Sequence, residues 1–359
     1  MEQSNMVEQK KIAWHSPMEP PFRIAGFAWF AEERRYRRLP TAPKWKLPEA
    51  VDILADHTAG GQIQFVTNSS SLHLSVRLKG KADMYHMPPT GQCGFDCYIG
   101  PPGNKKYCAT AQFKPWDQEY ESKLFENYSR EPRLITLNFP LYQGVEEVKV
   151  GLDHDAWVES PPAYDSTKKV VLYGTSITQG ACASRPGINY SNILSRRINM
   201  EFINLGFSGS GKGEPEVARV ISEIADPACL VLDYEANCVS TEQFRKTLPE
   251  FIQIFREAHP DVPILVVSRI PYAMDAHDPE SARTAAERKE LQRETVEARR
   301  AAGDNRIHFV DGSSYMTLEP QEISVDGIHP TDLGLMQIAD GLTPIIRNLI
   351  AGSGNETPA

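Results

Sequence analysis

At residues 170–178 the chain reads VVLYGTSIT, a run of apolar residues followed by glycine, threonine and serine. Such an apolar run is typical of a parallel strand that is buried on both faces. Ser176 stands where this strand should end, and the reactive groups of open α/β sheets gather at that edge. We therefore expect an α/β domain with Ser176 at the carboxyl end of its first strand.

Similar apolar runs recur through the C-terminal half of the sequence. The strand-like runs, rich in Val, Ile and Leu, lie at 170–173, 202–205, 229–233, 264–268 and 307–310. Between them, the segments 217–224 and 244–255 have apolar residues at helical spacing, and 279–302 has the charged, alanine-rich composition of a surface helix. This alternation predicts a flavodoxin-like, three-layer α/β/α domain over residues 166–352.

The N-terminal half has the two-residue period of half-buried β-strands instead. Leucine and valine alternate with polar residues at 72–78, and similar patterns occur at 135–139 and 148–152. Turn-forming glycine and proline clusters separate these runs. We expect a jelly-roll-like β-sandwich over residues 13–162. A linker at 159–163 would join it to the α/β domain, with disordered tails at 1–12 and 353–359.

Charge and composition exclude several classes of protein. The net charge of -9 argues against a nucleic-acid-binding surface, which needs clustered Lys and Arg. No run approaches the ~18 apolar residues of a membrane span, and the polar start lacks the apolar core of a secretory peptide. The six cysteines fit no zinc template, so we expect reduced thiols. No metal and no cofactor are expected. The expected protein is cytoplasmic and acts on a small molecule, without nucleic-acid or membrane partners; self-association into a homo-oligomer is left open.

Asp326-Gly327-Ile328-His329 places a carboxylate and an imidazole on one short loop near the C-terminus. A serine hydroxyl becomes a good nucleophile when a nearby imidazole takes its proton and a carboxylate holds the tautomer of that imidazole. Gly209 follows the second expected strand and Asn237 the third, at the edge of the sheet that also carries Ser176. The backbone N–H groups of Ser176 and Gly209 and the side-chain amide of Asn237 are candidate donors to an oxyanion.

Some of these features have simpler explanations when they are taken alone. A serine after a strand often only caps a helix. Residues 206–212 have the glycine and lysine spacing of a phosphate-binding P-loop, but Gly213 stands where such a loop needs Ser or Thr to hold Mg²⁺. Asp83 and His86 repeat the Asp-x-x-His spacing without a strand-end serine, so we expect His86 in the N-terminal fold or at the rim of the pocket.

Taken in order, these blocks resemble the SGNH (GDSL-type) hydrolase superfamily. The segment 94–98, Gly-Phe-Asp-Cys-Tyr, is similar to the Gly-x-Asp-Leu-Tyr signature of a branch with an N-terminal β domain. The resemblance covers about residues 14–350. It implies that Ser176 is the nucleophile, His329 the general base and Asp326 its orienting carboxylate, with Ser176, Gly209 and Asn237 forming the oxyanion hole. The family it resembles is metal-free and uses a covalent acyl-enzyme.

Three positions depart from the pattern of this family. Thr175 and Cys238 stand where Asp is frequent, and Cys97 replaces the Leu of the N-terminal signature. The change at Cys238 is expected to loosen the support of the preceding asparagine. None of the three removes a reacting group.

The resemblance implies an ester hydrolase, and the aromatic residues give a hint about its substrate. All five tryptophans precede the linker, and exposed aromatic rings can stack on sugars. We expect a small acyl group, such as acetyl, on a carbohydrate or another polar alcohol, with Arg185 as a candidate substrate-binding residue. An acyltransferase with the same triad is the alternative, because the two differ only in how well water is excluded from the acyl-enzyme. A pair of binding modules with an inactive hydrolase domain is disfavoured, because the reacting side chains are intact.

Overall fold

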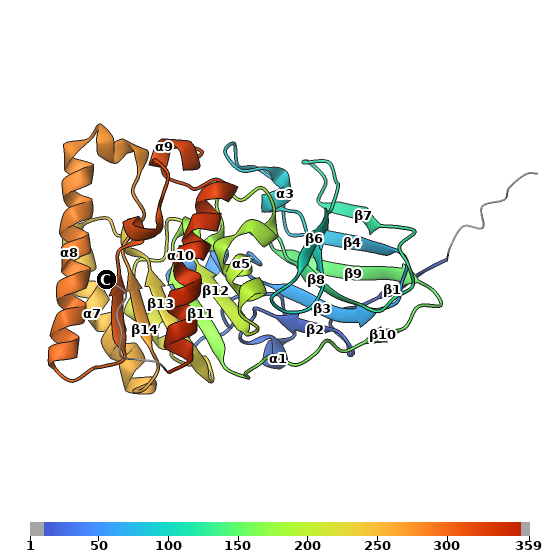
Figure 1. Ribbon diagram of the computed structural model, residues 1–359, viewed down its shortest axis with the longest axis horizontal. Helices are drawn as coiled ribbons and strands as arrows, with labels where there is room; N and C mark the ends of the chain where they lie inside the picture. The colour runs from blue at the N-terminus through green and yellow to red at the C-terminus, as the bar shows by residue number, and fades with distance from the viewer. Residues whose placement is uncertain (1–10, 353–359) are drawn as a thin grey trace, which may run out of the picture.

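The computed structural model describes residues 11–352, which form two parts side by side along the long axis (Figure 1). The β-rich N-terminal half lies at one end, and the C-terminal half, with its long helices, lies at the other. The expected tails fall mostly outside the described residues. Ile12, expected in the N-terminal tail, is instead the first residue of β1 (Ile12–His15), where it pairs with Asp153.

A five-stranded sheet forms the centre of the C-terminal half. Its strands are β11 (Lys169–Gly174), β12 (Glu201–Gly206), β13 (Pro227–Asp233), β14 (Ile264–Val267) and β15 (Ile307–Val310). They lie in the order β12-β11-β13-β14-β15, and all neighbours are parallel. This is the 2-1-3-4-5 order of flavodoxin-like sheets, and it confirms the predicted α/β class.

Helices cover both faces of this sheet because successive strand residues point to opposite sides. Val171 and Tyr173 of β11 belong to one core, while Val170 and Leu172 belong to the other. The first core is covered by α6 (Pro215–Ile221), α7 (Thr241–Ala258) and α8 (Pro279–Ala301), and the second by α5 (Tyr190–Arg197) and α10 (Asp332–Ile350). No helix within residues 11–352 is long and apolar enough to cross a bilayer.

The N-terminal half contains two antiparallel sheets. One has the order β1-β9-β4-β7, with β4 (Leu72–Leu78), β7 (Glu119–Phe125) and β9 (Val145–Asp153). The other has the order β10-β3-β8-β5-β6, with β2 (Arg23–Ala25) beside β3 (Gln62–Thr67), and with β5 (Asp96–Ile99), β6 (Lys106–Thr110), β8 (Arg133–Asn138) and β10 (Val158–Glu159). Both sheets contribute to one apolar core. The finer description as a jelly roll stays a prediction.

Short helices fill the connections between these elements. They are α1 (Phe30–Glu33), α2 (Glu49–Leu54), α3 (Pro89–Gln92), α4 (Ser176–Gln179), α9 (Pro320–Ile323), η1 (Pro186–Ile188), η2 (Glu235–Asn237), η3 (Ala273–Ala276) and η4 (Gly312–Tyr315). The expected linker at 159–163 begins one residue inside β10, because Glu159 pairs with β3. All six cysteines are free thiols.

The segment between β2 and β3 packs on the α/β domain. Trp29 and Trp45 contact the core under α6 and α7, although both precede the linker in the sequence. Arg38 is fully buried there and donates hydrogen bonds to the carbonyl oxygens of Leu54 and Gly206. Burial lowers the pKa of this guanidinium to about 9. The N-terminal half is thus tied to the end of β12, next to the expected oxyanion loop.

Candidate active site

Ser176 is the first residue of α4 and directly follows the end of β11. Thr175 caps this helix, since its Oγ1 accepts a hydrogen bond from the N–H of Ile177 at 3.2 Å. Gly174 allows α4 to lie close to the end of β11, because a Cβ atom there would lie 2.0 Å from Oγ1 of Thr178. The capping role therefore belongs to Thr175, and the hydroxyl of Ser176 is left for another partner.

That partner is His329, which comes from the loop before α10. The Oγ atom of Ser176 lies 2.8 Å from Nε2 of His329, and Nδ1 of His329 lies 2.8 Å from Oδ2 of Asp326. The other carboxylate oxygen of Asp326 accepts hydrogen bonds from the N–H groups of Ile328 at 3.0 Å and His329 at 2.8 Å. Partial burial opposes ionisation of Asp326, but these bonds outweigh it and lower its pKa to about 2. A carboxylate here makes Nδ1 the donor and leaves the lone pair of Nε2 facing the serine.

The three candidate oxyanion donors come from adjacent strand ends. Because β11 lies between β12 and β13, Ser176 is flanked by the loops that carry Gly209 and Asn237. Gly209 has φ +63, a conformation that L side chains rarely adopt, and a Cβ atom there would meet open space. Asn237 donates one hydrogen bond from Nδ2 to the carbonyl oxygen of Phe207 at 2.9 Å. This bond supports Asn237 despite the neighbouring Cys238, and the amide keeps a second hydrogen for a ligand.

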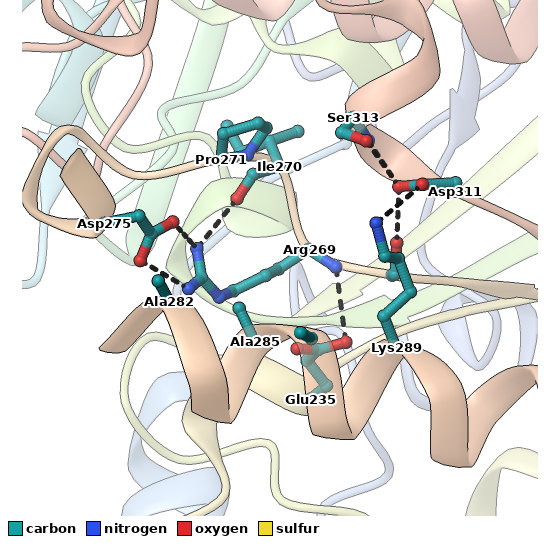
Figure 2. Close-up of a pocket in the computed structure, with 12 residues that line it drawn as sticks. Glu235, Arg269, Ile270, Pro271, Asp275, Ala282, Ala285, Lys289, Asp311 and Ser313 are labelled. Carbon is teal, nitrogen blue, oxygen red and sulfur yellow. Dashed lines mark hydrogen bonds and ion pairs between the residues drawn. The ribbon is translucent and has the colours of Figure 1, made fainter. Parts of the chain in front are cut away.

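The turn that carries Asn237 borders a charged cavity of about 200 Å³ (Figure 2). Oε2 of Glu235 accepts a hydrogen bond from the N–H of Arg269 at 3.3 Å, and Arg288 donates to the carbonyl oxygen of Glu235 at 2.9 Å. Arg269 also pairs with Asp275 at 2.8 Å. Burial raises the pKa of Glu235 to about 7. The buried carboxyl group of Glu235 thus anchors the same short turn that carries Asn237.

Arg185, the predicted substrate-binding residue, lies at the contact between the two halves. Its Nη1 donates to Oδ2 of Asp96 at 2.8 Å and to the hydroxyl of Tyr98 at 2.6 Å. Asp96 is fully buried and also accepts the N–H of Gly187 at 2.8 Å. The Asp and Tyr of the N-terminal signature therefore hold the loop after Ser176, and a contact of Arg185 with substrate stays a prediction.

Two residues of the N-terminal half lie near the triad: Tyr142, which the sequence analysis did not single out, and His86, which was expected in the N-terminal fold or at the rim of the pocket. The hydroxyl of Tyr142 donates to the carbonyl oxygen of Ser176 at 3.2 Å. The ring centroid of His86 lies 5.4 Å from that of His329. His86 thus lies beside the site. The Asp-x-x-His spacing of Asp83 and His86 was the only feature of the sequence that drew attention to it. Within residues 11–352, one group of side chains could hold a metal ion, namely His86, Cys182 and His329.

Asp233 was also missed, although it ends β13 next to the strand that carries Ser176. Its Oδ2 accepts hydrogen bonds from the hydroxyl of Tyr190 at 3.2 Å and from Oγ1 of Thr178 at 3.3 Å. Burial raises the pKa of Asp233 to about 7. A carboxylate at a strand end was a readable signal, but only the hydrogen bonds from Tyr190 and Thr178 show that Asp233 supports α4.

Known proteins share the overall fold over nearly the whole chain. A protein of Bacteroides ovatus described as a GDSL-like lipase is 29% identical, covers 95% of this chain and 98% of its own, and has a TM-score of 0.87. A salicylyl-acyltransferase from a tetracycline biosynthetic pathway is 21% identical, with coverage of 96% and 98% and a TM-score of 0.71. An acetyl xylan esterase of the rumen bacterium Butyrivibrio proteoclasticus is 15% identical, with coverage of 94% and 99% and a TM-score of 0.60. The last two show a shared fold only.

Two family models account for the two halves of the sequence. Residues 167–347 match the GDSL-like lipase/acylhydrolase family, and residues 12–158 match the N-terminal domain of SGNH hydrolase-type esterases. No curated protein matches the sequence significantly. The chain belongs to the GDSL-like lipase/acylhydrolase family, and it is a carboxylic ester hydrolase of the SGNH type.

Proposed function

We propose that the protein hydrolyses small acyl esters of carbohydrates or other polar alcohols, with Ser176 as the nucleophile. The observation that carries this proposal is the pair of 2.8 Å contacts, from Ser176 Oγ to His329 Nε2 and from His329 Nδ1 to Asp326 Oδ2. An imidazole in this arrangement can take the proton of the serine, while the carboxylate holds its tautomer and stabilises the imidazolium.

Acylation begins when Oγ of Ser176 forms a bond to the ester carbonyl carbon and its proton passes to Nε2 of His329. The resulting oxyanion accepts hydrogen bonds from the N–H groups of Ser176 and Gly209 and from Nδ2 of Asn237. Breaking the bond to the alcohol releases it with the proton that His329 held. Water then attacks the acyl-serine carbonyl carbon and gives a proton to Nε2 of His329. His329 returns this proton to Oγ of Ser176 as the bond from Oγ to the acyl carbon breaks and the carboxylic acid leaves.

The small acyl group is proposed by analogy, since one protein of this fold is an acetyl xylan esterase. The alcohol part is proposed by analogy, since proteins of this fold include an acetyl xylan esterase and a family two carbohydrate esterase of Cellvibrio japonicus.

The substrate class is tested with p-nitrophenyl esters of increasing acyl length and with an acetylated xylo-oligosaccharide. We expect kcat/KM to be highest for acetate and to fall through butyrate and octanoate. The acetylated sugar should be deacetylated, and Ser176→Ala should abolish turnover of every substrate. A preference for octanoate would contradict the proposal of a small acyl group but would leave the assignment of Ser176 as nucleophile unaffected.

Acyl transfer is the second candidate, because a salicylyl-acyltransferase has the same overall fold. Hydrolysis and transfer share every step up to the acyl-enzyme and differ in the group that attacks it. The partition is measured by adding a sugar or phenolic alcohol during turnover and quantifying free acid against new ester. Dominant formation of free acid supports the hydrolase, and dominant formation of the new ester would assign the protein as an acyltransferase.

A further inference from the structure

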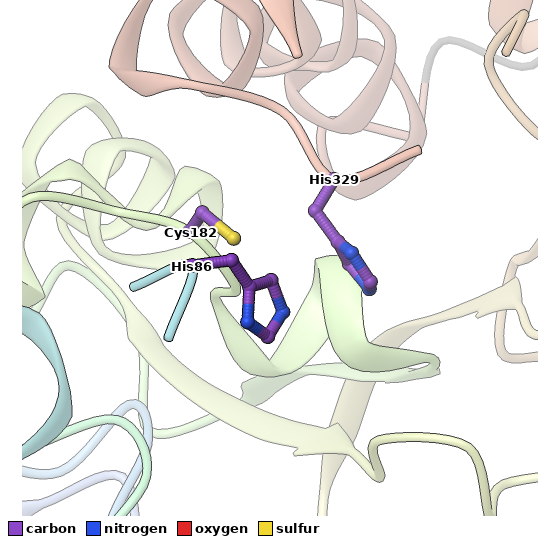
Figure 3. Close-up of side chains that lie close together, drawn as sticks. All are labelled: His86, Cys182 and His329. Atoms are coloured by element: carbon purple, nitrogen blue, oxygen red, sulfur yellow. The ribbon is translucent and has the colours of Figure 1, made fainter. Parts of the chain in front are cut away.

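Two side chains that could bind a metal ion lie beside His329, the proposed general base (Figure 3). His86, Cys182 and His329 each offer one ligand atom, and these atoms lie within 4.8 Å of one another. The sulfur of Cys182 and the two imidazole rings lie around the same space. Imidazole nitrogen and thiolate sulfur form the donor set that proteins use for Zn²⁺.

The segment that carries His86 is held in place by a buried glutamine. Oε1 of Gln92 accepts hydrogen bonds from the N–H groups of Asp83 and Met84, both at 3.0 Å, and Nε2 donates to the carbonyl oxygen of Met87 at 2.6 Å. Nδ1 of His86 is buried and has no hydrogen-bond partner within residues 11–352. An imidazole nitrogen in this state has a lone pair or proton unused by the fold.

Cys182 is brought to the same place by close packing between the two halves. A Cβ atom on Gly91 would lie 2.1 Å from the carbonyl oxygen of Ala183, so α3 touches the loop beside Cys182 directly. Thr90 strengthens this contact by donating from Oγ1 to the carbonyl oxygen of Ser184 at 2.6 Å. The loops that carry His86 and Cys182 therefore keep a defined relative position.

His329 is already oriented as a metal-ligating histidine is. Metal-bound imidazoles usually donate their other ring N–H to a carboxylate, a backbone carbonyl or water, which fixes the tautomer and increases ligand basicity. Nδ1 of His329 does this with Asp326 at 2.8 Å. The lone pair of Nε2 can then either accept the proton of Ser176 or bind a metal ion, but it cannot do both.

We propose that His86, Cys182 and His329 bind Zn²⁺ or a similar thiophilic divalent cation, and that this cation inhibits the enzyme by taking Nε2 of His329 from Ser176. Tetrahedral zinc needs ligand atoms about 3.5 Å apart, so ligand atoms that lie within 4.8 Å of one another approach by no more than about 1.3 Å on binding. The thiol of Cys182 loses its proton to solvent as the sulfur–metal bond forms. Water completes the coordination. The inhibition rests on the proposed function, whereas the binding does not.

Binding is measured first with Co²⁺ on the metal-free full-length Ser176→Ala protein, which needs no turnover. A tetrahedral cobalt–thiolate site gives a ligand-to-metal charge-transfer band and intense visible bands. We expect these bands in the Ser176→Ala protein. In the same background, Cys182→Ser should remove the charge-transfer band, and His86→Gln should weaken binding. Circular dichroism and thermal melting check that each variant is folded. Absence of the charge-transfer band from folded Ser176→Ala would overturn the site.

Inhibition is measured as p-nitrophenyl acetate turnover in buffered Zn²⁺, expressed for each variant as the ratio to its own metal-free rate. Loss of even an outer partner of a metal site weakens affinity about 10–100-fold, so His86→Gln should raise the half-inhibitory Zn²⁺ concentration at least about tenfold. Cys108→Ser and His154→Gln, at a free thiol and a histidine outside the cluster, are the matched controls and should not change it. EDTA should restore the wild-type rate. Equal inhibition of His86→Gln, Cys182→Ser and the controls would overturn the proposal.

Discussion

Replacing Asp326 with asparagine tests how the triad works. Oδ1 of Asp326 accepts two backbone N–H groups, and Oδ2 accepts Nδ1–H of His329 at 2.8 Å. In Asp326→Asn the amide oxygen can keep the two backbone bonds, so the loop should retain its shape. The amide nitrogen then faces Nδ1 of His329 with a donor, which moves the ring proton to Nε2.

The size of the effect follows from this change of tautomer. With a proton on Nε2, His329 cannot accept the proton of Ser176, so general-base catalysis is lost while the oxyanion donors remain. The same exchange of carboxylate for amide in a serine protease triad costs about 10⁴-fold in kcat. That factor equals about 5.4 kcal/mol of transition-state stabilisation at 1.36 kcal/mol for each factor of ten.

The assay is steady-state hydrolysis of p-nitrophenyl acetate, together with thermal melting of each variant. Asp326→Asn should lose about 10⁴-fold in kcat with little change in melting temperature. Asp326→Ala should lose activity and also stability, because both backbone N–H groups lose their acceptor. Asp155→Asn, at an exposed carboxylate, is the control for a change of charge alone. Activity of a folded Asp326→Asn variant within about tenfold of wild type would refute the tautomer argument.

Other variants separate the oxyanion donors, the contact between the halves and the charged cavity. Asn237→Ala should lower kcat by about 10²–10³-fold because it removes one oxyanion donor, and an unchanged kcat would exclude Asn237 from that role. Asp96→Ala leaves Arg185 unpaired at a buried contact, so urea titration should show a loss of about 3–5 kcal/mol in the free energy of unfolding; a loss below about 1 kcal/mol would count against it. The folded-state pKa of Glu235 is raised from 4.5 to about 7, so the wild type loses stability as pH rises through this window. Glu235→Gln should avoid that loss, and its stability relative to wild type should increase by up to about 3 kcal/mol between pH 4.5 and 7; a difference independent of pH would contradict the raised pKa.

Local patterns were sufficient to predict the sheet of the α/β domain. Each run rich in Val, Ile and Leu became a strand, as expected for parallel strands that helices cover on both faces. The sheet order and the gathering of Ser176, Gly209 and Asn237 at one edge follow from right-handed crossovers. The Asp-x-x-His spacing brings Asp326 and His329 together for a purely local reason, since the carboxylate also accepts the N–H groups of its own turn.

Contacts between distant segments could not be predicted in the same way. Nothing in the local pattern around Trp29 or Trp45 shows that these side chains pack on the α/β core rather than in the β-rich half. The pairing of Asp96 with Arg185 joins positions 89 residues apart, so neither residue carries a sign of its partner. His86 reaches the site only because α3 docks on the loop after Ser176. These interactions depend on how two domains fit together, which periodicity and spacing do not encode.

Covalent labelling of Ser176 tests the central claim most directly. The wild type and Ser176→Ala are each incubated with a fluorophosphonate, and intact mass is recorded alongside p-nitrophenyl acetate turnover. The account predicts one adduct on the wild type, mapped by peptide sequencing to Ser176, and neither adduct nor turnover in Ser176→Ala. A labelled or equally active Ser176→Ala protein would contradict the assignment of Ser176 as the nucleophile.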